Sequence, residues 1–133
     1  MRITNQSEYA IRAIMEMAKN PEMIYTPSSL YEKIDVPKLF LAKILQRLAK
    51  KGILKSIRGA TGGFSFKKSL QDITLLEIVE AIEGNASLNK CLMDGHLCDR
   101  KNFCPVHLIW VEAQESLNRV LSKKSIYQIL HNE

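Results

Sequence analysis

All three cysteines of the chain, Cys91, Cys98 and Cys104, lie in one short segment, and His107 follows the last of them. Six residues separate the first two cysteines, five separate the next two, and two separate Cys104 from His107. Three thiolates and an imidazole suit a soft metal, so the candidates are a structural zinc ion and an iron–sulfur cluster. No CxxC pair of the kind common in zinc sites occurs here, and the wide spacing favours the larger cofactor. His96 lies in the same segment and is an alternative to His107.

Disulfide bonds between these cysteines are not expected. An odd number of cysteines cannot complete a disulfide framework within one chain. The segment over residues 1–20 carries charges throughout, and no apolar run is long enough to cross a membrane. We therefore expect no signal peptide, no membrane partner and a cytoplasmic location, where thiols stay reduced. A redox switch made of metal-free thiols is the third alternative.

A long helix is predicted directly after the cysteines, from Pro105 to about Ser122. It places His107 one turn beyond Cys104, and residues three apart share a helical face, so both could bind one ion or cluster. Apolar residues recur along this helix at spacings of 4, 3, 4 and 3. They are Val106, Trp110, Ala113, Leu117 and Val120. This heptad pattern is typical of a helix that pairs with another helix, the alternative being a helix packed on the core of a monomer.

The remaining pattern predicts a mainly α fold. Helices are expected at residues 6–19, 27–34, 37–51 and 74–83, with a short helix near the C-terminus around 126–130. The short connection between the second and third helices makes a helix-turn-helix. A β-hairpin with a glycine-rich tip is expected directly after the third helix. The predicted fold is therefore a winged helix-turn-helix with a small hairpin wing and a long C-terminal dimerisation helix.

The positive charge belongs to one half of the chain. Residues 1–70 hold 13 Lys and Arg against 5 Asp and Glu, whereas residues 71–133 hold 6 against 9. A basic half predicts an anionic partner such as double-stranded DNA, although a merely soluble basic face would give the same count. We therefore expect a DNA-binding region over residues 1–70, and a cluster-binding loop with a dimerisation helix over residues 71–133. The length of 133 residues suits one compact domain that contains both regions.

The expected DNA contacts come from the third helix and the hairpin. The second helix of a helix-turn-helix enters the major groove with its N-terminal end toward the bases, which assigns Pro37, Lys38, Leu39, Lys43 and Arg47 to DNA. Further lysines nearby are expected at phosphates: Lys50, Lys51, Lys55, Lys67 and Lys68. The hairpin tip is expected in the minor groove, where Arg is favoured. Its contacts are Arg58, Gly59, Thr61 and Gly62.

An enzymatic function is not expected. The sequence contains no recognisable Ser/His/Asp set, phosphate-binding loop or pair of catalytic carboxylates.

Three segments of the chain resemble the Rrf-type bacterial transcription regulators, and the resemblance covers essentially the whole length. The segments are MRITNQSEYAIRAI, RLAKKGILKSIRGATGGF and the three cysteines with CPVHLIW. The resemblance implies a homodimer, here through residues 105–122, that binds a roughly palindromic operator. It also implies an iron–sulfur cluster on the cysteines, whose state alters DNA binding in response to cluster supply, iron, nitric oxide or redox state.

The resemblance implies two sets of cluster ligands. The pattern Cys104-Pro105-Val106-His107 is similar to that of IscR-like members, in which three Cys and this His hold a 2Fe–2S cluster, the favoured cofactor here. The gap between Cys91 and Cys98 is one residue longer than in that pattern. Glu8 stands where NsrR-like members supply a ligand from the partner subunit, which makes a 4Fe–4S cluster the alternative. Ala42 stands where IscR-like members often carry a Glu used in operator choice, so the operator sequence stays open.

Overall fold

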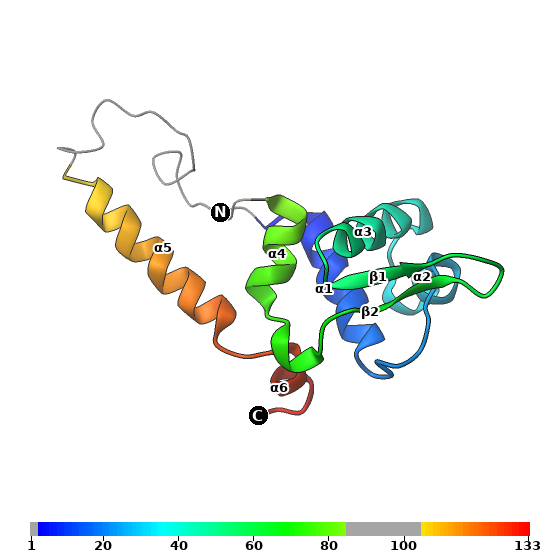
Figure 1. The fold of residues 1–133 in the computed structure, drawn as a ribbon. Helices are drawn as coiled ribbons and strands as arrows, with labels where there is room; N and C mark the ends of the chain where they lie inside the picture. The colour runs from blue at the N-terminus through cyan, green and yellow to red at the C-terminus, as the bar shows by residue number, and fades with distance from the viewer. Residues whose placement is uncertain (1–2, 85–104) are drawn as a thin grey trace.

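The computed structural model describes residues 3–84 and 105–133, and these are mainly helical with one two-stranded antiparallel sheet. The helices and strands follow the expected order (Figure 1). They are α1 (Asn5–Met17), α2 (Pro27–Ile34), α3 (Lys38–Lys50), β1 (Leu54–Ile57), β2 (Gly63–Phe66), the 3-10 helix η1 (Leu70–Asp72), α4 (Leu75–Glu83), α5 (His107–Ser122) and α6 (Ile126–Leu130). The predicted mainly α fold with a hairpin is confirmed, whereas the sequence pattern does not predict η1.

Helices α2 and α3 form the helix-turn-helix. At the start of α2, the Thr26 hydroxyl accepts the Ser29 N–H at 3.1 Å, and the Ser29 hydroxyl accepts the Thr26 N–H at 2.9 Å. This reciprocal cap satisfies two backbone groups and fixes where α2 begins. At its end, Asp35 takes the left-handed conformation with a φ of 54°. The buried Val36 follows, so the chain turns sharply and α3 begins within two residues.

The hairpin is attached to the helix-turn-helix by backbone hydrogen bonds. Strands β1 and β2 pair with Leu54 opposite Phe66 and Ile57 opposite Gly63. Tyr25, which lies just before α2, exchanges two backbone hydrogen bonds with Phe64, at 2.8 and 2.7 Å. An isolated antiparallel bridge therefore joins the segment before α2 to the hairpin. The hairpin tip lies on the side of the molecule away from α5 (Figure 1).

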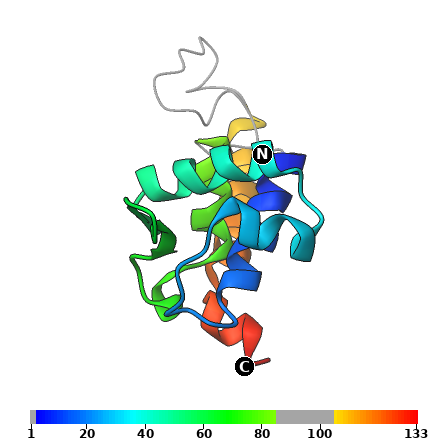
Figure 2. The same cartoon turned by 90° about the vertical axis from the view of Figure 1, so that its right-hand side faces the viewer.

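The C-terminal elements pack on the same body. Helix α4 packs against α1. The N–H of Ile126 donates to the carbonyl of Ile73 at 2.7 Å, and both side chains are fully buried. This contact holds α6 on the body. The helix lies at the opposite end of the body from α3 (Figures 1 and 2).

One hydrophobic core includes side chains from α1, α2, α3, α4 and α6. It holds residues from both sides of position 70, for example Leu45 and Ile78, so one core joins residues 1–70 to the described part of residues 71–133. Helix α5 contributes no buried residue. Phe40 is 48% exposed, because it lies at the edge of the buried face of α3.

Candidate DNA interface and metal-ligand positions

Helix α3 has two clearly different faces. Leu41, Ile44, Leu45 and Leu48 are buried and hold the helix on the core. The opposite face carries exposed residues at spacings of 4, 3 and 4, which places them on one line along the helix. This outward stripe consists of Leu39, Lys43, Gln46 and Lys50. The exposed face of α3 thus carries two lysines, and it is apolar at its N-terminal end.

The N-terminal end of α3 is open. Pro37 precedes the helix without a side-chain capping hydrogen bond, and both Pro37 and Lys38 are exposed. The first N–H groups of a helix have no intrahelical partner, and they favour an anion. A phosphate near Pro37 and Lys38 would therefore meet a lysine and free backbone donors together.

Arg47 lies to one side of the outward stripe. Its guanidinium donates to the side-chain oxygen of Gln6 at 3.0 Å, which joins α3 to the start of α1. Lys50, Lys51 and Lys55 are exposed. The structure thus gives Arg47 an internal partner, while the lysines remain available to phosphates.

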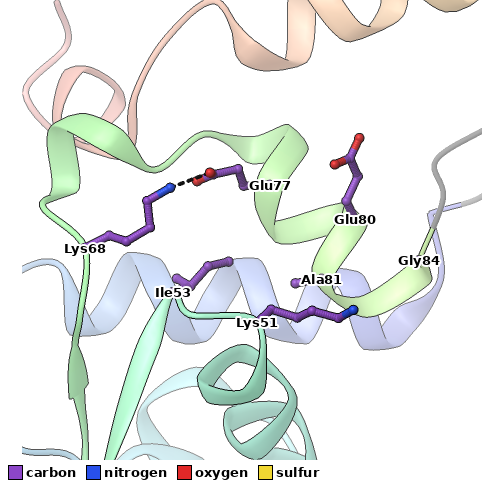
Figure 3. A pocket seen from close by; sticks show the side chains of 7 residues that line it. All are labelled: Lys51, Ile53, Lys68, Glu77, Glu80, Ala81 and Gly84. Carbon is purple, nitrogen blue, oxygen red and sulfur yellow. Dashed lines mark hydrogen bonds and ion pairs between the residues drawn. The ribbon is translucent and has the colours of Figure 1, made fainter.

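Lys68 differs from the other lysines expected at phosphates, because its ammonium forms an ion pair with Glu77 at the start of α4. Both line a cavity of about 470 Å³, together with Lys51 (Figure 3). Lys67 is exposed. A role for Lys68 in fixing α4 against the hairpin competes with the expected role at DNA.

The hairpin tip needs glycine at defined positions. The N–H of Gly62 donates to the carbonyl of Gly59 at 3.0 Å. A Cβ at Gly62 would lie 2.1 Å from the carbonyl oxygen of Ile57, far inside van der Waals contact. Gly59 has a φ of +108°, which side-chain-bearing residues rarely adopt. Arg58, Gly59 and Thr61 are exposed, so this tight turn presents them to solvent.

The expected metal ligands are only partly described. Cys91, Cys98 and Cys104 lie outside the described residues. Within residues 3–84 and 105–133, no three His, Cys, Asp or Glu side chains come together as a metal site. His107 is the first residue of α5, and its Nδ1 atom is buried without a hydrogen-bond partner among the described residues. A buried imidazole nitrogen without a partner is costly, and coordination would satisfy it, so His107 fits a ligand position.

Glu8, the alternative ligand, is an exposed residue in the first turn of α1. An exposed carboxylate on this helix is available to a partner subunit.

Glu83 joins the end of α4 to the start of α1, a contact that the sequence does not predict. Its carboxylate accepts hydrogen bonds from the Ser7 hydroxyl at 2.6 Å, from the Thr4 N–H at 3.2 Å and from the Thr4 hydroxyl. Burial raises the pKa of Glu83, but these hydrogen bonds and the charge of Arg47 outweigh it, so the pKa lies below its ordinary value. No sequence signal indicates a contact between residues so far apart in the chain.

Helix α5 exposes an unusual amount of apolar surface. Its large apolar residues are exposed by 37% to 73%: Val106, just before the helix, and Leu108, Ile109, Trp110 and Val120. Three of the five residues of the predicted heptad seam, Val106, Trp110 and Val120, are in this set. Val106, Ile109, Trp110 and Val120 lie on one side of the helix, whereas Leu108 lies on the other side. In the described part of the chain, no element buries the side that carries these four residues.

Comparisons with known proteins agree with this fold. Residues 3–132 match the family Rrf2, described as "Iron-dependent Transcriptional regulator". Two relatives named HTH-type transcriptional regulator IscR, from Klebsiella pneumoniae strain 342 and Escherichia coli strain K12, are 26% and 25% identical over 134 residues. These alignments cover 100% of this chain and 82% of each relative.

Solved structures show the same fold. IscR of T. potens has a TM-score of 0.76 at 21% identity, covering 99% of this chain and 88% of that chain. CymR of B. subtilis, described as its global cysteine regulator, has a TM-score of 0.76 at 20% identity, covering 100% of this chain and 98% of that chain. In the described part of this chain, no helix is long and apolar enough to span a membrane.

Proposed function

Since the chain belongs to the Rrf2 family of transcriptional regulators and is IscR-like, we propose that its affinity for a double-stranded DNA operator depends on an iron–sulfur cluster. The family and the relatives are transcriptional regulators and not enzymes, as the sequence predicts. The observation that carries the DNA-binding part is the outward stripe of α3, which is basic, exposed and opposite the buried face.

In this proposal α3 is the recognition helix. Lys38 and Lys43 approach the major groove, and Lys50, Lys51 and Lys55 neutralise phosphates beside it. In the same proposal Arg58, at the hairpin tip, enters the adjacent minor groove, where the glycines allow close approach of the backbone. The exposure of these side chains supports the assignment.

The proposed cofactor is held by Cys91, Cys98, Cys104 and His107, with a 2Fe–2S cluster favoured. The buried, unpartnered Nδ1 of His107 supports a ligand at this position. Glu8 of a partner subunit is the alternative fourth ligand, and a 4Fe–4S cluster would then apply. When bound, such a cluster supplies a centre whose occupancy and charge change with iron supply, nitric oxide or redox conditions.

The protein's own residues offer a route from the cysteine segment to DNA. Glu83 ends α4 directly before the residues that contain the cysteines, and it is bound to Thr4 and Ser7 at the start of α1. In the same first turn, Gln6 accepts from Arg47 of α3. A displacement at the end of α4 is therefore transmitted to the recognition helix through direct contacts.

The proposed regulator is a homodimer through residues 105–122. A dimer is supported by the exposed apolar residues of α5, which carry the heptad pattern on a helix without buried residues. Two recognition helices held by one interface would read two half-sites of a palindromic operator.

The ligand assignment is tested on protein purified without oxygen, by counting iron and acid-labile sulfide per chain. We expect both in the wild type, together with visible absorption, and neither in the Cys104→Ala variant. If His107→Ala loses iron and Glu8→Ala keeps it, His107 is the fourth ligand and the 2Fe–2S arrangement is supported. If Glu8→Ala loses iron and His107→Ala keeps it, the carboxylate from the partner subunit is the fourth ligand. Colourless protein that contains zinc, or no metal, would overturn the cluster and leave DNA binding standing.

A further inference from the structure

Leu39 is an exposed leucine near two exposed lysines, Lys38 and Lys43. It is 82% exposed, the highest value among the large apolar side chains that the structure describes. It lies in the first turn of α3, at the N-terminal end of the outward stripe, with Lys43 one turn further along. The core packing of α3 is supplied by other residues, so Leu39 has little to do in holding the fold together.

A single exposed leucine is common on protein surfaces and by itself indicates nothing. Leu39 differs from other exposed leucines because it lies at the N-terminal end of the proposed recognition helix. Recognition helices place their N-terminal residues against base edges, and the stripe that begins with Leu39 is directed away from the core. An apolar side chain there can neither bind phosphate nor accept or donate a hydrogen bond.

The major-groove edges of DNA offer one apolar group, the C5-methyl of thymine. We propose that Leu39 contacts a thymine methyl group in each half-site and is thereby a specificity-determining residue of this chain. This inference rests on the proposed DNA-binding function and adds a base preference to it. Pairing of the two apolar groups removes both from water, which is worth about a three- to tenfold change in affinity.

The experiment uses the full chain, purified without oxygen, and DNA sequences that it selects from a random pool. In the selected sequence each thymine is replaced in turn by uracil, which removes only the methyl group. We expect one position per half-site at which uracil weakens binding about three- to tenfold. In the Leu39→Ala variant, thymine and uracil at that position should bind equally.

Lys50→Ala is the matched control, because Lys50 lies on the same stripe but is expected at a phosphate. Lys50→Ala should weaken binding to the thymine DNA and to the uracil DNA by the same factor. The ratio of the two dissociation constants should therefore equal that of the wild type. Thermal unfolding of Leu39→Ala should match the wild type, since the side chain is exposed.

The outcomes separate the two proposals. If the wild type selects a sequence but no uracil substitution matters, or if Leu39→Ala keeps the sensitivity, the assignment of Leu39 is wrong while DNA binding stands. If the wild type selects no sequence from the pool, both the proposed function and this inference fail.

Discussion

At the scale of single residues, Glu83 shows how an ordinary carboxylate can connect distant parts of the chain. It lies at the N-terminus of α1, where a negative charge is favourable, and it accepts hydrogen bonds from Thr4 and Ser7. Its lowered pKa means that the ionised carboxylate of Glu83 is more stable in the folded protein than in the unfolded chain. Glu83 therefore stabilises the fold only while it is charged.

Glu83→Gln should lower the free energy of unfolding at pH 7 by about 1 kcal/mol, because the amide cannot accept these hydrogen bonds as a charged group. The contribution is complete above the ordinary carboxyl pKa of 4.5 and is lost as the pH falls through the lower folded-state value. Denaturant unfolding of both proteins at pH 7 and near pH 3 measures this, and the curves should converge at low pH.

Glu80→Gln is the matched control, since Glu80 is exposed on the same helix, and it should change stability little. An equal loss in both variants, or a loss independent of pH, would show that the contact of Glu83 with α1 does not stabilise the fold.

At the scale of elements, the hairpin depends on backbone geometry at its tip. Gly62 lies so close to the carbonyl of Ile57 that any side chain must displace the turn. The core does not include the tip, so the strain stays local.

Gly62→Ala should weaken DNA binding about tenfold, equal to about 1.4 kcal/mol, while the helical content stays unchanged. The reason is that a displaced turn moves Arg58 and Thr61 out of place. Fluorescence anisotropy with labelled DNA measures the affinity, and circular dichroism checks the helices. Ala60→Ser, at the exposed tip, is the control and should bind like the wild type. Unchanged affinity in Gly62→Ala would remove the hairpin from the interface.

The sequence predicts most elements because their local signals are strong. The start of the second helix at residue 27 and the glycine-rich hairpin tip depend on signals within a few residues, and both are confirmed. Contacts between distant segments leave no such signal, which is why Glu83 with Ser7 and Arg47 with Gln6 were not foreseen. The exposure of Phe40 likewise has no local signal, because helical spacing gives its angle on α3 but not how far the neighbouring helices cover it.

At the scale of the whole molecule, α5 lies on the outside of the body (Figure 1). Its exposed large apolar residues lie near its two ends. Its predicted seam includes Trp110, the single tryptophan of the chain. A protein of this size rarely leaves such a face in water, and a second copy of α5 offers a matching one.

Val120→Glu should convert the dimer to a monomer, because two carboxylates would face each other at the apolar seam. Analytical ultracentrifugation measures the mass, and the fluorescence of Trp110 should shift to longer wavelength as the ring becomes exposed. Glu115→Gln, exposed on α5 outside the seam, is the control and should stay dimeric. A wild type that is monomeric at micromolar concentration would contradict the proposed interface.

The central claim is that DNA affinity depends on the cluster, and one comparison tests it most directly. The affinity of oxygen-free protein for its selected DNA is measured before and after the iron is removed by a chelator, at one fixed salt concentration. We expect the two dissociation constants to differ about tenfold or more, which is a typical coupling between two sites. Equal constants, with iron and sulfide present at the start, would contradict cluster-dependent regulation.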